Sequence, residues 1–150
     1  MTRFGRIRFS LVLLGLFAVA GCGGTTDKVI LTTSPRLNIC EGSDPHPVVV
    51  KIYYLRSAER FSRADFGALW DDDIGTLADD RLRLVEKTLN PKEQVTLPLQ
   101  RDDAVKDATV LGIVANFCRQ GEGCWRKTVP IGEDGAQIRV HLDEGCLSID

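Results

Sequence analysis

The sequence is poor in the side chains on which most enzymes depend. It contains two histidines, His46 between two prolines and His141 in a stretch that alternates like a strand. It has no G-x-S-x-G motif, no H-E-x-x-H motif and no glycine-rich phosphate loop. Its acidic runs lack the D-x-D-x-D-G order of a calcium-binding loop. These absences argue against an enzyme, and they predict no catalytic residues, no metal site and no cofactor.

The sequence also has no apolar run of membrane length. The run at residues 11–21 follows Arg3, Arg6 and Arg8. It is shorter than the about 20 residues that span a bilayer core of ~30 Å. A positively charged start followed by a short apolar core is typical of a secretory signal peptide. We therefore assign residues 1–21 to a signal peptide.

The signal segment ends at a cysteine. Residues 19–22 are Val, Ala, Gly and Cys, which resembles the lipobox of bacterial lipoproteins. That resemblance implies cleavage before Cys22, diacylation of its thiol and acylation of the new amino terminus. Two or more acyl chains anchor a protein stably, so we expect a lipid-anchored domain with residues 22–27 as its tether. The alternatives are an ordinary signal peptide cut at Ala20 or Gly21, and an uncleaved anchor.

The chain that remains after cleavage is acidic. Removing residues 1–21 takes away three arginines, so Lys+Arg falls from 19 to 16 against 21 Asp+Glu, and the net charge changes from −2 to −5. A negative net charge argues against nucleic-acid partners. In Gram-negative lipoproteins, an aspartate directly after the lipidated cysteine indicates retention in the inner membrane, and this chain has Gly23 there. By that resemblance we expect the outer membrane, on its periplasmic face.

Four cysteines remain once Cys22 is assigned to the lipid anchor. An even number of cysteines outside the cytosol favours two disulfides, for which three connectivities exist. We predict Cys118–Cys124, a local bridge across a hairpin turn, and Cys40–Cys146, which would join an early loop to the final strand. A four-cysteine zinc site is the competing interpretation, although the chain has no C-x-x-C pair.

Most of the remaining chain has the alternation or the β-branched runs that are typical of strands. Turn signals such as Asn90-Pro91 separate these runs. We therefore expect residues 28–150 to form one all-β domain, a two-sheet antiparallel β-sandwich of about eight strands. The expected strands are residues 29–33, 48–55, 81–85, 94–99, 109–117, 125–131, 137–142 and 146–149.

One segment, at about residues 62–80, has helical spacing instead. Ser62 followed by Asp65 is typical of a helix start with a capping box. The run Asp71, Asp72 and Asp73 is expected to begin a second short helix, because carboxylates complement the helix dipole. We therefore predict a small helical insertion after the second strand.

Several segments match a known family in their order and spacing. They are Leu37-Asn38, residues 47–55, Phe61, residues 64–66, Leu69, residues 89–93, residues 111–115 and residues 125–127. Together they resemble the TssJ lipoproteins of the bacterial type VI secretion system. The resemblance implies a transthyretin-like sandwich on the inner face of the outer membrane. It also implies binding to the periplasmic C-terminal region of TssM, an inner-membrane protein, and so a role in anchoring the membrane complex.

In that family the loop between the first two strands carries the contact with TssM, and here it corresponds to residues 34–46. Leu37 and Ile39 contribute little to the strand pattern, so their side chains would be available to a partner; the alternative is that both pack on the sheet edge. The chain departs from the family at Cys40, inside the loop, and at Lys92, where a glycine is expected. The candidate contacts are Arg36, Leu37, Asn38, Ile39, Glu41 and Asp44.

Two other classes of function stay open from the sequence. One is an outer-membrane lipoprotein of a different envelope machine, such as a secretin pilotin or a lipopolysaccharide-export protein. The other is a solute-binding or hydrolytic lipoprotein, which would have a concave polar pocket with titratable residues.

Overall fold

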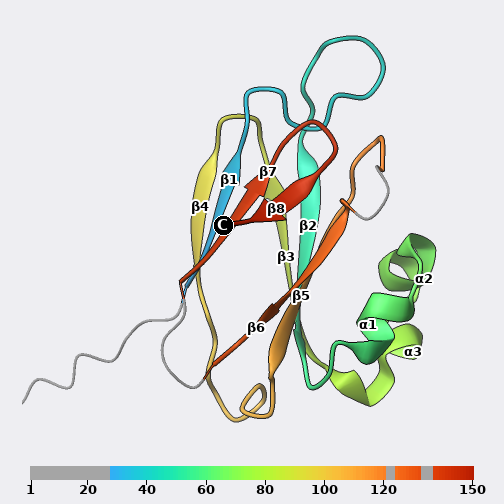
Figure 1. Ribbon diagram of the computed structural model, residues 1–150, viewed down its shortest axis with the longest axis vertical. Coiled ribbons are helices and arrows are strands. Elements are labelled where there is room, and N and C mark those ends of the chain that lie inside the picture. Colours follow the sequence, from blue (N-terminus) through green and yellow to red (C-terminus); the bar gives the residue numbers. More distant parts are fainter. Residues whose placement is uncertain (1–27, 121–123, 133–136) are drawn as a thin grey trace, which may run out of the picture.

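The computed structural model describes residues 28–120, 124–132 and 137–150. The predicted signal peptide, the tether at residues 22–27 and the candidate lipidation site Cys22 lie outside these residues. Within the described ranges the chain forms eight strands, arranged as two four-stranded sheets that face each other (Figure 1). A small helical insertion follows the second strand, so the fold class predicted from the sequence is confirmed.

The two sheets have the strand orders β4-β1-β7-β8 and β3-β2-β5-β6. The pair β1–β7 is parallel, and the chain reaches β7 by crossing over from the other sheet. The other five pairs in the described residues are antiparallel, so the predicted antiparallel arrangement holds except at this pair. The strands are β1 Lys28–Thr33, β2 Val48–Leu55, β3 Arg81–Leu89, β4 Gln94–Pro98, β5 Val110–Ala115, β6 Arg126–Pro130, β7 Gln137–Leu142 and β8 Leu147–Ile149.

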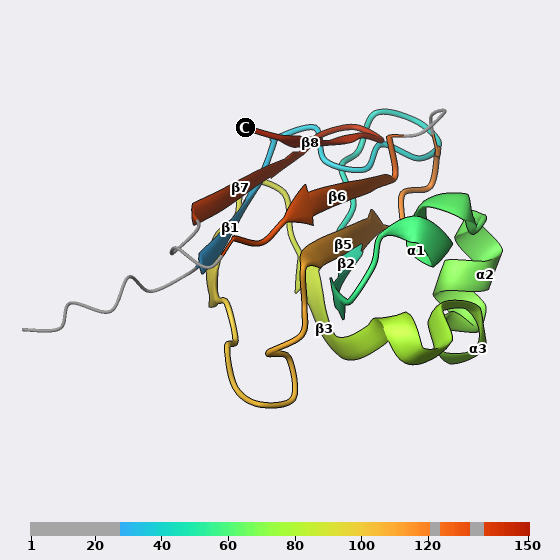
Figure 2. The same ribbon diagram turned by 60° about the horizontal axis from the view of Figure 1, so that its bottom comes forward.

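Strand β2 is buried on both of its faces. Ile52 and Tyr54 belong to the core between the sheets, whereas Tyr53 and Leu55 belong to a second core beneath the helices. Figure 2 shows the helices covering the outer side of β2 and β5. A strand that is covered on both faces is apolar at successive positions, which explains why residues 48–55 give the strongest strand signal in the sequence.

The helical insertion begins at residue 59, earlier than predicted. Ser62 lies within the first helix and is not its cap. Asp65 caps the second helix by accepting a hydrogen bond from the Ala68 amide at 2.8 Å, and Asp72 caps the third by accepting one from Gly75 at 3.1 Å. The insertion consists of α1 Glu59–Arg63, α2 Phe66–Asp71, α3 Asp73–Leu77 and the 3-10 turn η1 Ala78–Asp80.

Polar side chains from the second sheet hold this insertion in place. The Lys51 Nζ donates to the carbonyl of Trp70 at 2.8 Å, and the Tyr53 hydroxyl donates to the carbonyl of Leu69 at 2.9 Å. The Arg126 Nη1 donates to the carbonyl of Phe61 at 2.9 Å. Each donor meets a carbonyl near the end of a short helix and so satisfies an unpaired group, and the two cations, Lys51 and Arg126, also complement the helix dipole. The described part of the chain contains no helix that is long and apolar enough to cross a membrane.

Candidate functional site

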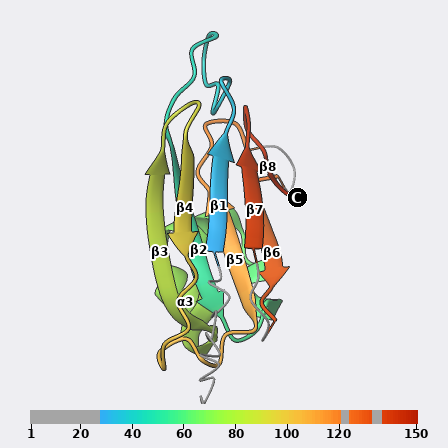
Figure 3. The same ribbon diagram turned by 90° about the vertical axis from the view of Figure 1, so that its left-hand side faces the viewer.

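The loop between β1 and β2 (residues 34–47, the β1–β2 loop) projects from the end of the sandwich at which β1 and β7 finish (Figure 3). The turn between β7 and β8 and the start of the loop after β5 lie at the same end of the molecule (Figure 1). We call residues 34–40 the base of the β1–β2 loop and residues 41–46 its tip, because the two parts differ in their contacts.

The base is hydrogen-bonded to the turn after β7. The backbone amide of Ser34 donates to the carbonyl of Leu142 at 2.9 Å, and the amide of Asn38 donates to Asp143 at 3.2 Å. The amide of Ile39 donates to Glu144 at 3.1 Å. These bonds follow on from the end of the β1–β7 pairing and fasten the base to the turn after β7 at three positions.

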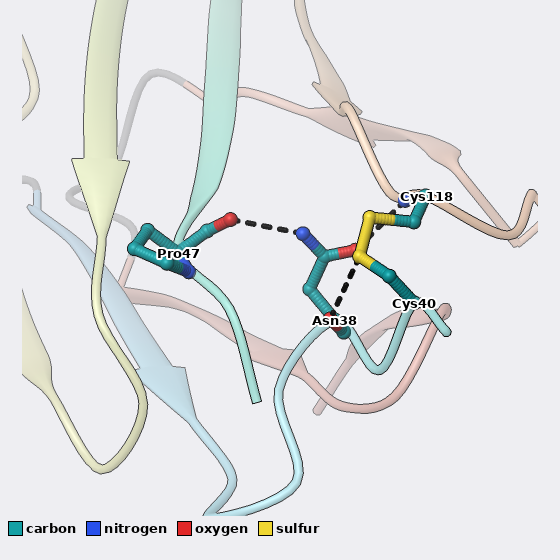
Figure 4. The surroundings of a disulfide bond; sticks show 4 residues. All are labelled: Asn38, Cys40, Pro47 and Cys118. Atoms are coloured by element: carbon teal, nitrogen blue, oxygen red, sulfur yellow. Dashed lines mark hydrogen bonds between the residues drawn. A yellow bond between two sulfur atoms is a disulfide. The ribbon is translucent and has the colours of Figure 1, made fainter. Parts of the chain in front are cut away.

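The Asn38 side chain cross-links three parts of this end of the molecule. Its Oδ1 accepts a hydrogen bond from the Cys118 amide at 2.8 Å, and its Nδ2 donates to the Pro47 carbonyl at 2.9 Å (Figure 4). Asn38 is 4% exposed and has a φ of 50°, a backbone conformation that asparagine tolerates better than most residues. The family resemblance made Asn38 a candidate contact, but in the structure it is a buried brace.

The disulfides differ from the predicted pairs. Cys40 is bonded to Cys118 and Cys124 to Cys146, with Cα–Cα distances of 5.2 Å and 4.5 Å. The predicted pairs Cys118–Cys124 and Cys40–Cys146 are therefore wrong. The two hairpin cysteines diverge because each is held by a different neighbour: the Cys118 amide bonds to Asn38, whereas the Cys124 carbonyl accepts from the amide that opens β8, at 2.9 Å.

Leu37 and Ile39 are core residues and not exposed contacts. Leu37 is 0% exposed and belongs to the main core between the sheets, and Ile39 is 6% exposed. The expectation that both side chains are available to a partner is wrong, and the alternative, packing against the sheet, is what the structure has. Leu37 thus anchors the base of the loop in the core between the sheets.

The remaining candidate contacts are at the surface. Glu41 and Asp44 are exposed in the tip, and the tip closes where the His46 amide donates to the Leu37 carbonyl at 3.0 Å. Arg36 is exposed in the base and forms an ion pair with Glu144. The hydrogen bond to that carboxylate raises the pKa of Arg36, so this side chain already has an anionic partner.

Two open depressions flank Arg119, a residue that the sequence gave no reason to select. One has a volume of about 590 Å³ and is lined by Cys40, Glu41, His46, Cys118 and Arg119. The other has a volume of about 310 Å³ and is lined by Ile39, Arg119, Cys124, Glu144, Gly145 and Cys146. Between them the backbone is tightly packed, since a Cβ on Gly145 would lie 2.6 Å from the Arg119 carbonyl oxygen. Among the described residues no group of three or more His, Cys, Asp or Glu side chains is placed to bind a metal ion.

A family model described as "Type VI secretion lipoprotein, VasD, EvfM, TssJ, VC_A0113" matches residues 25–145. The chain belongs to this family. The match covers the whole sandwich up to the turn before β8, and so includes the β1–β2 loop and the helical insertion. A search of curated proteins gave no match.

Solved structures of type VI secretion proteins have the same fold. The lipoprotein TssJ1 from Pseudomonas aeruginosa is 25% identical, with a TM-score of 0.75 over 83% of this chain and 95% of that one. The Serratia marcescens protein Lip, described as a membrane-bound component of the system, is 19% identical, with a TM-score of 0.71 over 82% of this chain and 95% of that one. A chain of the structure described as "Type VI membrane complex" is 25% identical, with a TM-score of 0.74 over 84% of this chain and 98% of that one.

The segments that resemble the TssJ family have structural roles here. Lys51, Tyr53 and Arg126 fasten the helical insertion to the sheet, and Trp125 packs edge-on against Phe66 at 5.3 Å between ring centroids. Lys92, the departure from the family pattern, has a φ of 60°. That value explains why a glycine is expected at this turn, because glycine adopts positive φ at little cost.

Proposed function

We propose that this lipoprotein anchors a type VI secretion membrane complex to the outer membrane by binding the periplasmic C-terminal region of a TssM-like inner-membrane protein. One observation carries the proposal: an exposed tip stands on a base that is braced by backbone hydrogen bonds, by Asn38 and by a disulfide. A braced base reduces the conformational entropy lost when a loop binds a partner. Membership of the type VI secretion lipoprotein family supports the same role.

The direction of β1 supports an anchor at one end and a partner at the other. The chain enters β1 at Lys28 and leaves it at Thr33, just before the β1–β2 loop (Figure 3). A strand of this length spans roughly 17–20 Å. A lipid on Cys22, followed by the tether at residues 22–27, would therefore hold the domain by the end opposite the tip, and the tip would face into the periplasm.

The chemistry of the tip suggests the kind of surface that it meets. Residues 41–46 contain two carboxylates, Glu41 and Asp44, and no lysine or arginine. A protein surface that binds the tip should therefore be positively charged, because complementary charge steers association and disfavours wrong partners. We propose a binding role and no catalytic role for this end of the molecule.

A binding measurement with charge-reversed variants tests the proposal. The double variant Glu41→Lys, Asp44→Lys should bind the periplasmic region of the TssM-like protein at least tenfold more weakly than the wild type, with most of the change in the association rate. Asp71→Lys, an exposed carboxylate on α2, is the matched control and should change the affinity less than twofold. If wild type and double variant bind with equal affinity, the tip is not the docking site; if the wild type does not bind, the proposed partner is wrong.

The anchor has a separate test. We propose lipidation at Cys22, so Cys22→Ser should release the protein from outer-membrane fractions or leave it as an uncleaved precursor. Mass spectrometry of the amino terminus checks the modification directly. An unmodified Cys22 in membrane-bound wild-type protein would contradict the proposal.

A further inference from the structure

We propose that the Cys40–Cys118 disulfide is a reducible latch on the β1–β2 loop, and that its reduction by a dithiol protein weakens partner binding. This inference rests on the proposed function for its effect on binding, but not for its effect on the loop itself. The bridge joins the last residue of the base to the loop after β5, across a sequence separation of 78 residues.

The two disulfides differ in their accessibility. Cys118 is exposed, and together with Cys40 it lines the larger open depression, which also contains His46 and Arg119. Cys40, Cys124 and Cys146 are half-buried, and the last two line the smaller depression. Arg119 borders both depressions, so its charge does not distinguish the two bridges. Of the four cysteines in the described residues, only Cys118 is exposed, so access favours the attack of a dithiol on Cys40–Cys118.

Among the described residues, the bridge is one of few links between the tip and the rest of the structure. On one side the tip is held by Cys40, and on the other by the hydrogen bond from the His46 amide to Leu37 and by the bond from Asn38 to Pro47. Without the bridge, the bond from the Cys118 amide to Asn38 is what still ties the base to the loop after β5. Opening the disulfide therefore loosens the tip and leaves the sandwich intact.

The exchange needs no group beyond the dithiol. One thiolate of the dithiol protein attacks the Cys118 Sγ, which forms a mixed disulfide and expels the Cys40 Sγ as a thiolate that takes a proton from water. The second thiol of the dithiol protein, as its thiolate, then attacks the mixed disulfide and releases Cys118, which is protonated in turn. The two cysteines gain two electrons, and the dithiol protein loses two as its own disulfide forms.

The coupling between reduction and binding is reciprocal. If reduction weakens the affinity for the partner by a given factor, the bound partner must make the disulfide harder to reduce by the same factor. A tenfold factor corresponds to about 30 mV for a two-electron couple. Binding of the partner in an assembled complex would thus make the Cys40–Cys118 disulfide harder to reduce.

Differential alkylation tests the latch without any partner. The full-length protein, purified from membranes in detergent, is treated with reduced thioredoxin, and the cysteines that become reactive are identified by mass spectrometry over time. We expect Cys40 and Cys118 to be labelled at least tenfold faster than Cys124 and Cys146, and amide exchange at residues 41–46 to rise at the same time. Labelling of Cys124 and Cys146 first, equal rates, or unchanged exchange in the tip would each overturn the proposal.

Binding to the TssM-like region then tests the consequence. Cys40→Ser, Cys118→Ser should weaken binding at least fivefold relative to oxidised wild type, whereas the control Cys124→Ser, Cys146→Ser should stay within twofold. Equal binding by the first variant and the wild type overturns the latch but leaves the proposed function standing. Failure of oxidised wild type to bind refutes the proposed function instead, and the alkylation result then decides the latch by itself. If a serine variant does not fold, wild-type protein reduced by thioredoxin and alkylated at Cys40 and Cys118 replaces it.

Discussion

Replacing Asn38 with alanine should destabilise the protein by about 3 kcal/mol. The side chain makes two hydrogen bonds, to the Cys118 amide and to the Pro47 carbonyl, and each contributes about 1 kcal/mol net. The backbone at φ 50° adds roughly 1 kcal/mol, because alanine tolerates the left-handed region less well than asparagine. Asn38→Asp keeps the acceptor for Cys118 but buries a carboxylate whose other oxygen faces the Pro47 carbonyl, so it should cost at least as much as alanine.

Urea denaturation with both disulfides intact measures this loss. Asn116→Ala is the matched control, because Asn116 is an exposed asparagine just after β5, and its replacement should change the free energy of unfolding by less than about 0.5 kcal/mol. Amide hydrogen exchange gives a local readout, since the Cys118 amide should exchange faster in Asn38→Ala and stay protected in Asn38→Asp.

Two results would refute this account of Asn38. The first is a destabilisation by Asn38→Ala no larger than that of the control, which would mean that solvent replaces both hydrogen bonds at no cost. The second is an unchanged stability combined with a large loss of partner binding. That pattern would make Asn38 a direct contact, as the family resemblance implies, and not a buried brace.

Three further predictions concern the scaffold. Gly112→Ala should cost about 1–3 kcal/mol in urea denaturation, because the added Cβ would lie 2.6 Å from the ring of Phe61 and the close-packed core beneath the helices has no room for it. Ala78→Gly should stabilise the protein by about 1 kcal/mol, because the φ of 46° and ψ of −127° at this position suit glycine. Lys92→Gly should stabilise the protein by about half of that. A loss of stability in either variant would contradict the backbone conformation described for that residue. Burial raises the pKa of Tyr53, so the folded state holds the hydroxyl proton more tightly than the unfolded state does. The stability that this difference contributes is present below pH ~10 and should fall as the pH rises above ~10. Tyr53→Phe should lose about 1 kcal/mol at pH 7 with its hydrogen bond, and its stability should fall less steeply between pH 9 and 11 than that of the wild type.

The strands could be predicted because their signals are local. The alternation in residues 137–142 and the apolar run in residues 48–55 each follow from which faces of a strand are covered, and both strands form where expected. The spacing of residues 62–80 predicts the helical insertion but places its start too late, since α1 begins at Glu59. Ser62 and Asp65 fit a capping box, whereas the structure uses Asp65 as the cap of α2 and begins α1 before Ser62.

The disulfides and the loop could not be predicted in the same way, because they depend on which segments meet in space. Cys118 and Cys124 are close in the sequence and suggest a bridged hairpin. The structure separates them because Asn38, 80 residues from Cys118, holds one strand end, while β8 holds the other. The parallel pairing of β1 with β7 has the same origin. It brings residues 142–144 beside the base of the β1–β2 loop, in which Leu37 and Ile39 are buried.

The residues that reveal the family are different from those proposed to bind the partner. Lys51, Tyr53 and Arg126 hold the helices on the sheet, and Leu37 fills the core below the loop. These are scaffold roles, which any protein with this fold must fill in some way. The tip contributes no segment to the family resemblance. It is exposed, and its charged side chains are accessible to a partner. Under the proposed function, partner choice would depend on residues 41–46, which contribute nothing to the family pattern, and a charge reversal there should leave the scaffold unchanged.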